Sequence, residues 1–164
     1  MRIAVTDACI FIDLIELNLL DEFCCLPFVI YTTIDVFYEL NVEQQTKISY
    51  LKSQSKILLE TLSSEEMNLI LVRDFPAALS LTDRTVILLS EKFNAVLISS
   101  DKAVRNCAGK NAIECHGILW IIDQLVDNKI ITFYQSCEKL IFLTKNKFYA
   151  NNSELMTEIN KRLN

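Results

Sequence analysis

The sequence predicts an α/β domain with a mainly parallel central sheet and helices on both of its faces. Short apolar runs typical of buried strands alternate with longer segments in which apolar residues recur at helical spacing. Apolar residues make up 51% of the chain. Glycine and proline occur only twice each, which favours long helices with short loops and excludes a disordered or low-complexity chain.

The expected strands are short runs of apolar or β-branched residues bounded by polar ones. They cover residues 2–6, 28–31, 56–62, 95–99 and 112–115. The run from Ala95 to Ile98 contains no polar residue. Such continuous apolarity is expected of a strand that is covered on both faces, as in the middle of a parallel sheet.

The expected helices lie between and after these strands, and most carry capping signals. They cover residues 10–20, 34–41, a segment beginning at 63–66, 83–93, 101–107, 118–126, 131–143 and 152–162, while residues 42–53 form a polar helix or loop. Thr32-Thr33 is a good N-cap for the helix that follows it, and Ser63-Ser64-Glu65-Glu66 starts another helix in the manner of a capping box. We expect Pro76 to break the helix that starts near Ser63, Thr82 to cap the next helix and Asn94 to end it.

At 164 residues the chain is expected to form a single domain, residues 1–164. No apolar run approaches the roughly 18 residues needed to span a bilayer, and the N-terminus lacks the pattern of a signal peptide. The six cysteines form no C-x-x-C pair and there is only one histidine, so a zinc site is not expected. These features favour a cytoplasmic protein with reduced thiols and no membrane partner.

The net charge of −5 is unevenly distributed along the chain. Residues 129–164 carry six lysines or arginines against three acids, and the preceding 128 residues carry ten against eighteen. An acidic protein is a poor general binder of nucleic acid, so any contact with phosphate has to be local. The candidates for such contacts are Lys102, Arg105, Lys110, Lys145 and Lys147.

Four acidic residues lie where expected strands or helices begin or end. Asp7 and Asp101 follow expected strands, Asp83 opens an expected helix, and Glu39 lies in a short apolar helix. In a parallel sheet such positions converge at the carboxyl ends of the strands. Carboxylates held together among apolar neighbours are costly unless a cation neutralises them, and Mg²⁺ or Mn²⁺ suits oxygen ligands. The pattern predicts a metal-dependent phosphoryl-transfer enzyme.

A simpler role is open for several of these polar residues. Asp83 and Asp101 also fit helix caps. The other acids of the first helix region are expected to be solvated, namely Asp13, Glu16, Asp21 and Glu22. The aromatic residues, including Trp120 and Tyr149, are expected to serve as core or dimer contacts. Cys9 is expected to be a small apolar packing residue.

Four short motifs resemble those of the PIN-domain ribonucleases, in the same order and at similar spacing. They are Val5-Thr6-Asp7-Ala8-Cys9, Tyr38-Glu39-Leu40, Leu81-Thr82-Asp83-Arg84 and Leu97-Ile98-Ser99-Ser100-Asp101-Lys102. The resemblance covers about residues 1–135 and leaves residues 136–164 as a helical C-terminal extension. It implies a three-layer α/β/α fold. Many family members have a second acid beside the last one, where this chain has only Asp101.

The resemblance also implies a site and a reaction. In that family Mg²⁺ or Mn²⁺ activates water for attack on an RNA phosphodiester, and the acidic quartet maps onto Asp7, Glu39, Asp83 and Asp101 as catalytic and metal-binding residues. Ser99 matches a hydroxyl residue that supports the ligands. Lys102 and Arg105, one and four residues after Asp101, are expected to contact phosphate.

Three functions remain open at this stage. The leading one is an endoribonuclease that resembles VapC-type toxins, whose expected partners are RNA, a small antitoxin protein and a second copy of the chain. The second is a catalytically silent PIN scaffold that binds RNA or protein. The third is a phosphatase-like enzyme, which the sequence disfavours because Asp7-Ala8-Cys9 breaks the D-x-D pattern of such enzymes.

Overall fold

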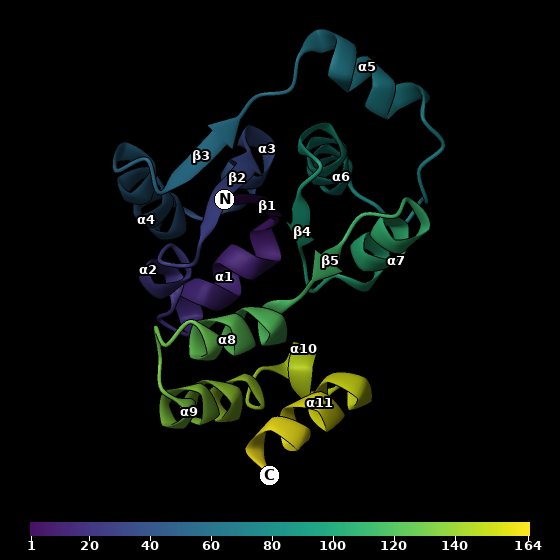
Figure 1. Cartoon of the computed structure of the whole chain (residues 1–164). Helices are drawn as coiled ribbons and strands as arrows, with labels where there is room; N and C mark the ends of the chain where they lie inside the picture. The colour runs from purple at the N-terminus through teal and green to yellow at the C-terminus, as the bar shows by residue number, and fades with distance from the viewer.

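The computed structural model describes residues 1–164 and shows a five-stranded, entirely parallel sheet flanked by helices (Figure 1). This confirms the predicted fold class. The strands are β1 (Arg2–Thr6), β2 (Phe28–Thr33), β3 (Ile57–Glu60), β4 (Val96–Ile98) and β5 (Cys115–His116). Their order across the sheet is β3-β2-β1-β4-β5.

The order of the strands reverses direction on either side of β1. Ala4 pairs with Ile30 of β2 on one side and with Val96 of β4 on the other. The chain therefore runs outward from β1 to β3, crosses back, and continues outward through β4 and β5. In open parallel sheets such a reversal opens a crevice outside the carboxyl ends of the strands on either side of it. The fold therefore predicts a binding site at the carboxyl ends of the paired strands β1 and β4.

The helices form two layers around the sheet and a separate group at the C-terminus. They are α1 (Ala8–Glu16), α2 (Leu20–Phe23), α3 (Ile34–Glu39), α4 (Val42–Ser53), α5 (Ser64–Val72), α6 (Leu81–Phe93), α7 (Lys102–Lys110), α8 (Ile118–Asp127), α9 (Phe133–Leu143), α10 (Lys147–Ala150) and α11 (Ser153–Leu163). Helix α6 packs along β1, β2 and β4, whereas α1 packs against α2, α3 and α8. Helices α9, α10 and α11 lie together beyond α8 (Figure 1).

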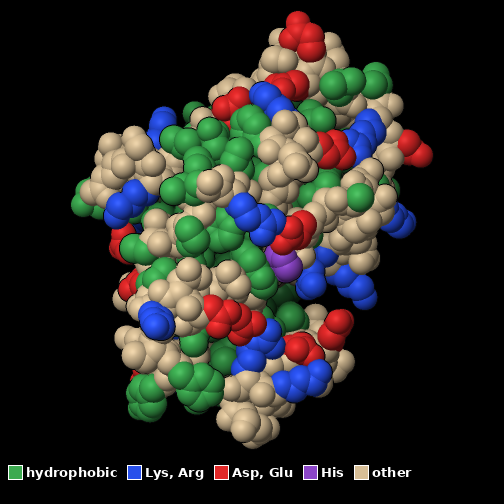
Figure 2. All heavy atoms as spheres, viewed as in Figure 1, with side chains coloured by type: hydrophobic (Ala, Val, Ile, Leu, Met, Phe, Trp, Pro, Cys, Tyr) green, Lys and Arg blue, Asp and Glu red, His purple; other side chains and the backbone are tan.

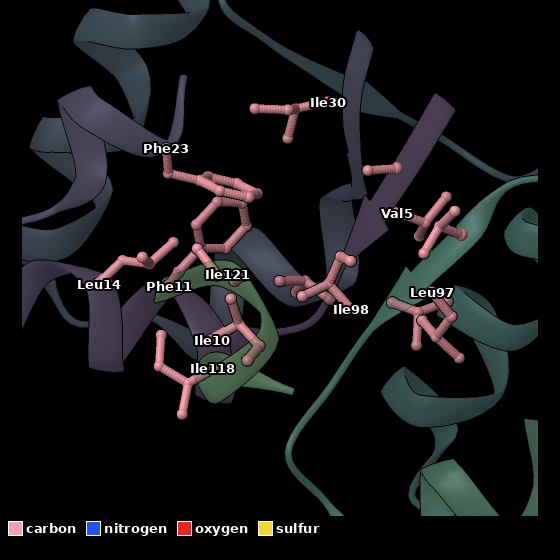
Figure 3. Packing of buried hydrophobic residues seen from close by; sticks show 14 of the residues in the cluster. Val5, Ile10, Phe11, Leu14, Phe23, Ile30, Leu97, Ile98, Ile118 and Ile121 are labelled. Carbon is pink, nitrogen blue, oxygen red and sulfur yellow. The ribbon is translucent and has the colours of Figure 1, made fainter. Parts of the chain in front are cut away.

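The hydrophobic core lies between the sheet and α1, with α8 and α2 beside it (Figure 3). Phe11 and Leu14 of α1, Phe23 of α2 and Ile121 of α8 approach one another there, and all four are buried. Their recurrence at helical spacing places them on the buried faces of these helices. Because this layer holds α1 against the sheet, it also fixes the first turn of α1 at the end of β1.

Two expected boundaries move because backbone groups near them are used for capping. Helix α1 begins at Ala8 rather than residue 10 and ends at Glu16, since Asn18 adopts a left-handed conformation with φ of 55°. The last strand is Cys115–His116 rather than 112–115. Ala112 has φ of 55°, and the amide of Ile113 donates to the carbonyl of Ala108 (2.9 Å) at the end of α7. That amide therefore closes a helix instead of joining the sheet.

The other expected helices form with modest differences. Thr33 and Ser63 are N-caps as predicted, and Asn94 ends α6 in a left-handed conformation. Helix α5 already ends at Val72, four residues before Pro76. The polar segment 42–53 is helical throughout. In the C-terminal part, the short helix α10 was not predicted.

No helix of the structure is both long and apolar enough to cross a lipid bilayer.

We predict that shortening a core side chain of β4 destabilises the domain strongly. Leu97 is fully buried, so Leu97→Ala should lower the free energy of unfolding by about 2–5 kcal/mol. Leu71 of α5 is 70% exposed, and Leu71→Ala should change it by about 0.5 kcal/mol or less. Urea denaturation followed by circular dichroism measures both. Equal effects of the two substitutions would contradict this packing.

Candidate functional site

Asp7 lies at the centre of the candidate site, where β1 ends and α1 begins. Its amide donates to the carbonyl of Ile98 (3.2 Å), which pins it beside the end of β4. Its carboxylate caps α1 by accepting a hydrogen bond from the amide of Ile10 (3.1 Å). The residue is only 5% exposed. Capping explains why an acid is tolerated here, but one amide donor satisfies only part of the hydrogen-bonding capacity of a buried carboxylate.

Burial dominates the electrostatics of Asp7. Removal from water raises its pKa from 3.8 to about 6, hydrogen bonds from Cys9 and Ser99 oppose that rise, and the charge of Asp83 adds to it. The Cys9 thiol donates to the carboxylate at 3.0 Å, so Cys9 is more than the apolar packing residue expected from the sequence. Asp7 is thus a carboxylate whose charge the protein alone stabilises poorly.

Asp83 reaches the same edge of the sheet from the other layer. Helix α6 precedes β4 and packs along β1, β2 and β4, so its first turn lies at the carboxyl ends of the strands. The Thr85 hydroxyl lies 2.9 Å from the Thr33 hydroxyl at the end of β2, which fixes this turn. The negative charge of Asp83 raises the pKa of Asp7, as expected of an acid at the same sheet edge.

Asp83 is also part of a capping box, in which the N-cap is Ser80 rather than the predicted Thr82. The Asp83 amide donates to the Ser80 hydroxyl (3.1 Å), and the Ser80 amide donates to Oδ2 of Asp83 (2.8 Å). The hydroxyl residue alone does not distinguish the two N-cap candidates, because Ser80 and Thr82 are both followed by helix-forming residues. The structure chooses Ser80 because only there does an acid stand three residues later.

Asp101 follows β4 and caps α7. Its Oδ1 accepts a hydrogen bond from the amide of Val104 (2.9 Å), while its own amide donates to the hydroxyl oxygen of Ser99 (3.1 Å). Ser99 is fully buried, and its hydroxyl also lowers the pKa of Asp7. This hydroxyl therefore acts on both acids at the carboxyl ends of β1 and β4. Asp101 itself is exposed, so it is the member of the site most open to a ligand from solvent.

Glu39 is placed differently from the other three acids. It is the last residue of α3, it is exposed, and its side chain makes no hydrogen bond or ion pair with another residue. The sequence suggested a carboxylate among apolar neighbours. In the structure Val36 is buried in the core, whereas Tyr38, next to Glu39, is 71% exposed. The structure therefore brings Asp7, Asp83, Ser99 and Asp101 to one edge of the sheet, while Glu39 is an exposed residue at the end of α3.

The site has donors suited to a divalent cation without being a closed cage. No three histidine, cysteine or acidic side chains lie close enough together to hold a metal ion. Mg²⁺, however, keeps several waters and is usually bound through one or two carboxylates together with substrate phosphate. The buried carboxylate of Asp7, destabilised by burial and by Asp83, fits that requirement, because a cation relieves both effects.

The predicted phosphate contacts lie next to this edge. Lys102 and Arg105 are exposed residues of the first turns of α7, directly after Asp101. Neither forms an ion pair with any acid of the protein. Both cations are consequently available to an anionic ligand that approaches Asp101.

A second buried acid was missed in the sequence. Asp13, expected to be solvated, is 8% exposed and accepts a hydrogen bond from the hydroxyl of Tyr149, a buried residue of α10. Burial raises the pKa of Asp13 to about 6, the Tyr149 hydrogen bond opposes this rise, and the charges of Glu16 and Asp7 add to it. Asp13 follows Cys9 by one helical turn, which is a signal that it shares a face with the site; nothing local indicates Tyr149 as its partner.

The pair between Asp13 and Tyr149 ties the C-terminal helices to the site. Burial and the Asp13 charge raise the pKa of the Tyr149 phenol, while a hydrogen bond with Ser100 opposes that rise. Ser100 is also the acceptor for the amide of Ile118 at the start of α8 (3.2 Å). Through its hydrogen bond to Asp13, Tyr149 ties α10 to α1, so the extension is part of the support of the site.

Comparison with known proteins agrees with this fold and identifies it as a PIN domain, which is generally a nuclease fold. The chain belongs to the PIN-domain family DUF3368, whose family profile matches residues 3–164. This match confirms the resemblance seen in the sequence, and it extends through the C-terminal helices.

Two solved structures share the fold. One is a PilT N-terminus domain protein from the hyperthermophilic archaeon Sulfolobus solfataricus P2, with a TM-score of 0.53 and 17% identity over 76% of this chain and 94% of that one. The other is a domain of a functionally unknown protein from Methanocaldococcus jannaschii DSM 2661, with a TM-score of 0.51 and 19% identity over 72% and 91% of the two chains. No curated protein sequence matches the chain significantly.

We predict that ionisation of Asp7 destabilises the metal-free domain. Because its pKa is raised from 3.8 to about 6 in the folded state, the folded protein binds more protons than the unfolded chain between these values. The stability that protonated Asp7 contributes is therefore complete below about pH 4 and lost as the pH rises through about 6. Asp7→Asn should remove this loss and be more stable than the wild type at pH 7.5, by on the order of 2–3 kcal/mol.

The measurement is urea denaturation in EDTA between pH 4 and pH 7.5. The matched control is Asp74→Asn, which changes an exposed acid outside the site and should leave the pH dependence of the wild type intact. A wild-type and an Asp7→Asn curve that stay parallel over the whole range would contradict the burial of this carboxylate.

We further predict that Tyr149→Phe destabilises the protein by about 1–3 kcal/mol, because it leaves the buried carboxylate of Asp13 without its donor. The Tyr149 hydrogen bond lowers the pKa of Asp13, so it favours the ionised form. The loss should consequently be larger at pH 8 than at pH 5, where Asp13 is mostly protonated. Phe148→Leu, at an exposed neighbour, is the control; a pH-independent loss in Tyr149→Phe would argue against the pair.

Proposed function

We propose that the protein is a metal-dependent endoribonuclease that hydrolyses RNA phosphodiester bonds at the edge formed by Asp7, Asp83 and Asp101. The observation that carries the proposal is Asp7, a buried carboxylate at the switch point whose pKa is raised by burial and by a second acid. Ionisable groups whose pKa is shifted by burial and by a neighbouring charge are typical of functional sites. Structural caps rarely need such burial, because exposed acids cap helices equally well.

Each residue has a separate role in this proposal. Asp7 and Asp83 hold the Mg²⁺ or Mn²⁺ ion, directly or through water, and Asp101 completes the shell at its exposed side. Ser99 supports both acids, because its hydroxyl accepts from the Asp101 amide and lowers the pKa of Asp7. Glu39, an exposed residue at the end of α3, completes the shell or orients water.

The chemistry itself is that of a bound divalent cation, which supplies an activated water and shields charge on the phosphate. Lys102 and Arg105 attract and position the phosphate beside the acids. Their unpaired state supports this role, because an ion pair within the protein would have to be broken first. Asp7, kept in a dry environment by Ile10 and Ile98, binds a cation more strongly than an exposed acid would.

The proposal includes the partners expected of a toxin of a toxin–antitoxin pair. These are RNA as substrate, a small antitoxin protein as inhibitor and a second copy of the chain in a homodimer. Exposed apolar side chains support a role in protein contacts. They are Leu69, Leu71, Val72 and Leu81 around α5, and Phe133, Ile141, Phe142 and Phe148 on the C-terminal helices.

A second function is favoured by a specific observation and is kept as the alternative. The structure has no cluster of three side chains that could hold a metal ion. A catalytically silent PIN scaffold that binds RNA or protein would have the same fold and would not need such a cluster. The two functions differ in whether cleavage requires a metal and Asp7.

We predict that Asp7→Asn and Asp101→Asn each lower metal-dependent RNA cleavage at least about 100-fold, a loss on the order of 3 kcal/mol in the activation barrier. An amide removes the charge that holds the cation while keeping the shape of the side chain. Cleavage of a mixed pool of structured and unstructured RNA is measured with Mg²⁺, with Mn²⁺ and with EDTA. Asp74→Asn is the matched control and should cleave as the wild type does.

A thermal shift on the same proteins separates the two functions. Under the nuclease proposal, Mn²⁺ raises the melting temperature of the wild type and has little effect on Asp7→Asn, because the ion binds the folded state through this carboxylate. If the folded wild type, free of any co-purified protein, neither cleaves RNA nor gains stability from Mn²⁺ or Mg²⁺, the silent scaffold replaces the nuclease. Cleavage that persists in Asp7→Asn would refute the site.

A further inference from the structure

A groove of about 570 Å³ runs beside the candidate site, and none of the four acids of that site lines it. One wall is α7, the floor is the segment from β5 into α8, and the opposite wall is α11 of the C-terminal extension. Ser100 and Lys102, which flank Asp101, both line it. Figure 2 shows a hollow below the single histidine, between the body of the protein and the C-terminal helices. The groove therefore opens next to the place where cleavage is proposed.

The wall formed by α7 presents free positive charge. Lys102 and Arg105 are exposed there, three residues apart on one side of the helix, and neither is neutralised by an acid. The other cation of the groove is Arg162 of α11, which is held by Asp123 (2.7 Å) and Glu158 (3.3 Å). An anion in the groove would consequently be drawn to the α7 side.

The floor of the groove carries a stacked pair of rings. The rings of His116 and Trp120 lie 4.3 Å apart at an angle of 6°, and Phe28 packs behind Trp120 at 5.9 Å. Glu114 holds the His116 ring through a contact of 2.9 Å to Nε2 and is itself bound by Arg2. His116 and Trp120 both remain partly exposed. A fixed, partly exposed aromatic surface of this kind is what a nucleobase stacks on.

The wall formed by α11 is held firmly and has the opposite charge. The double contact of Arg162 with Asp123 joins α11 to α8, and the extension is anchored again by Tyr149 on Asp13. Glu154 lines the groove without an ion pair of its own. Its charge repels phosphate, so a nucleotide in the groove has only one favourable orientation, with its phosphate toward α7.

We infer that this groove is a subsite for one nucleotide of single-stranded RNA next to the scissile phosphate, with the backbone phosphate on Lys102 and Arg105 and the base on the His116–Trp120 pair. In a duplex both faces of a base are covered by the neighbouring bases of the stack, so no face is free for the aromatic pair. The subsite therefore selects unpaired RNA. The inference rests on the proposed function and assigns to the C-terminal extension the role of enclosing the substrate.

The test measures binding rather than cleavage. A short fluorescent single-stranded RNA is titrated with the cleavage-deficient Asp7→Asn protein in EDTA, and the dissociation constant is obtained from anisotropy at several salt concentrations. The double substitution Lys102→Gln with Arg105→Gln should weaken binding at least about tenfold and reduce the slope of log K against log salt by about 0.7, since the neutralisation of one phosphate is lost. Lys110→Gln, on the same helix but outside the groove, is the control and should leave both quantities nearly unchanged.

The contribution of the base is measured with His116→Ala. This variant should bind the RNA about 5-fold to 100-fold more weakly, the range expected for losing one stacked base. Its binding of an oligonucleotide of the same length made of abasic residues should equal that of the parent protein. His116→Ala removes the ring contacts with Glu114 and Trp120, but Glu114 keeps its ion pair with Arg2, and circular dichroism checks that the fold is retained.

The outcomes separate this inference from the proposed function. Groove substitutions that weaken binding of RNA support the subsite even if the wild type cleaves nothing, which would overturn only the nuclease. Binding that is insensitive to Lys102, Arg105 and His116 while the wild type still cleaves RNA overturns the subsite and leaves the nuclease. Equal losses in the Lys110→Gln control, or no binding at low salt, also overturn the subsite.

Discussion

The buried carboxylate of Asp7 is the constraint on which the arrangement of this domain depends. A parallel sheet whose order reverses beside its first strand leaves a crevice at one edge, and Asp7 occupies that crevice with almost no access to water. The surroundings are organised around the cost of this burial. The first turn of α1, the Cys9 thiol and the Ser99 hydroxyl each direct a donor to the carboxylate, yet its pKa is still raised.

The same carboxylate explains why so many different elements meet at one place. Helix α6 brings Asp83 from the layer opposite α1, and the end of β4 brings Ser99 and Asp101. The hydrogen bonds to Asp7 do not offset the effect of its burial on its pKa, and the charge of Asp83 raises that pKa further. Capping and cation binding are compatible in such a site. Each acid accepts a hydrogen bond from a backbone amide at a helix end and keeps other oxygen lone pairs for a ligand.

The sequence predicted much of this architecture because the signals were local. Apolar runs marked the strands, and the residues Thr33, Ser63 and Asn94 marked helix ends at the correct positions. Asp7 and Asp101 lie at one sheet edge because both follow strands of the parallel sheet, and Asp83 opens the helix that precedes β4. Ser99 was singled out only through the family resemblance, and the roles of all these residues stay predictions.

What the sequence did not predict depends on contacts between distant residues. Asp13 looks like any acid on an amphipathic helix, and only Tyr149 of α10 reveals that it is buried. Glu39 seemed to be surrounded by apolar side chains, but the short helix α3 ends with that residue in solvent. The last strand was misplaced because Ile113 closes α7, a competition between helix and sheet that residue propensities do not resolve.

The contact between Tyr149 and Asp13 has a consequence for how the chain reaches its final form. The two residues are 136 positions apart, so an acid in the first helix lacks its hydrogen-bond partner until nearly all of the sequence has been synthesised and folded. Contacts of such long separation form late, because the loop between them must close first. A shortened chain that ends after α8 would therefore be a different molecule from the full domain, since it would carry an unpaired carboxylate one helical turn from Cys9.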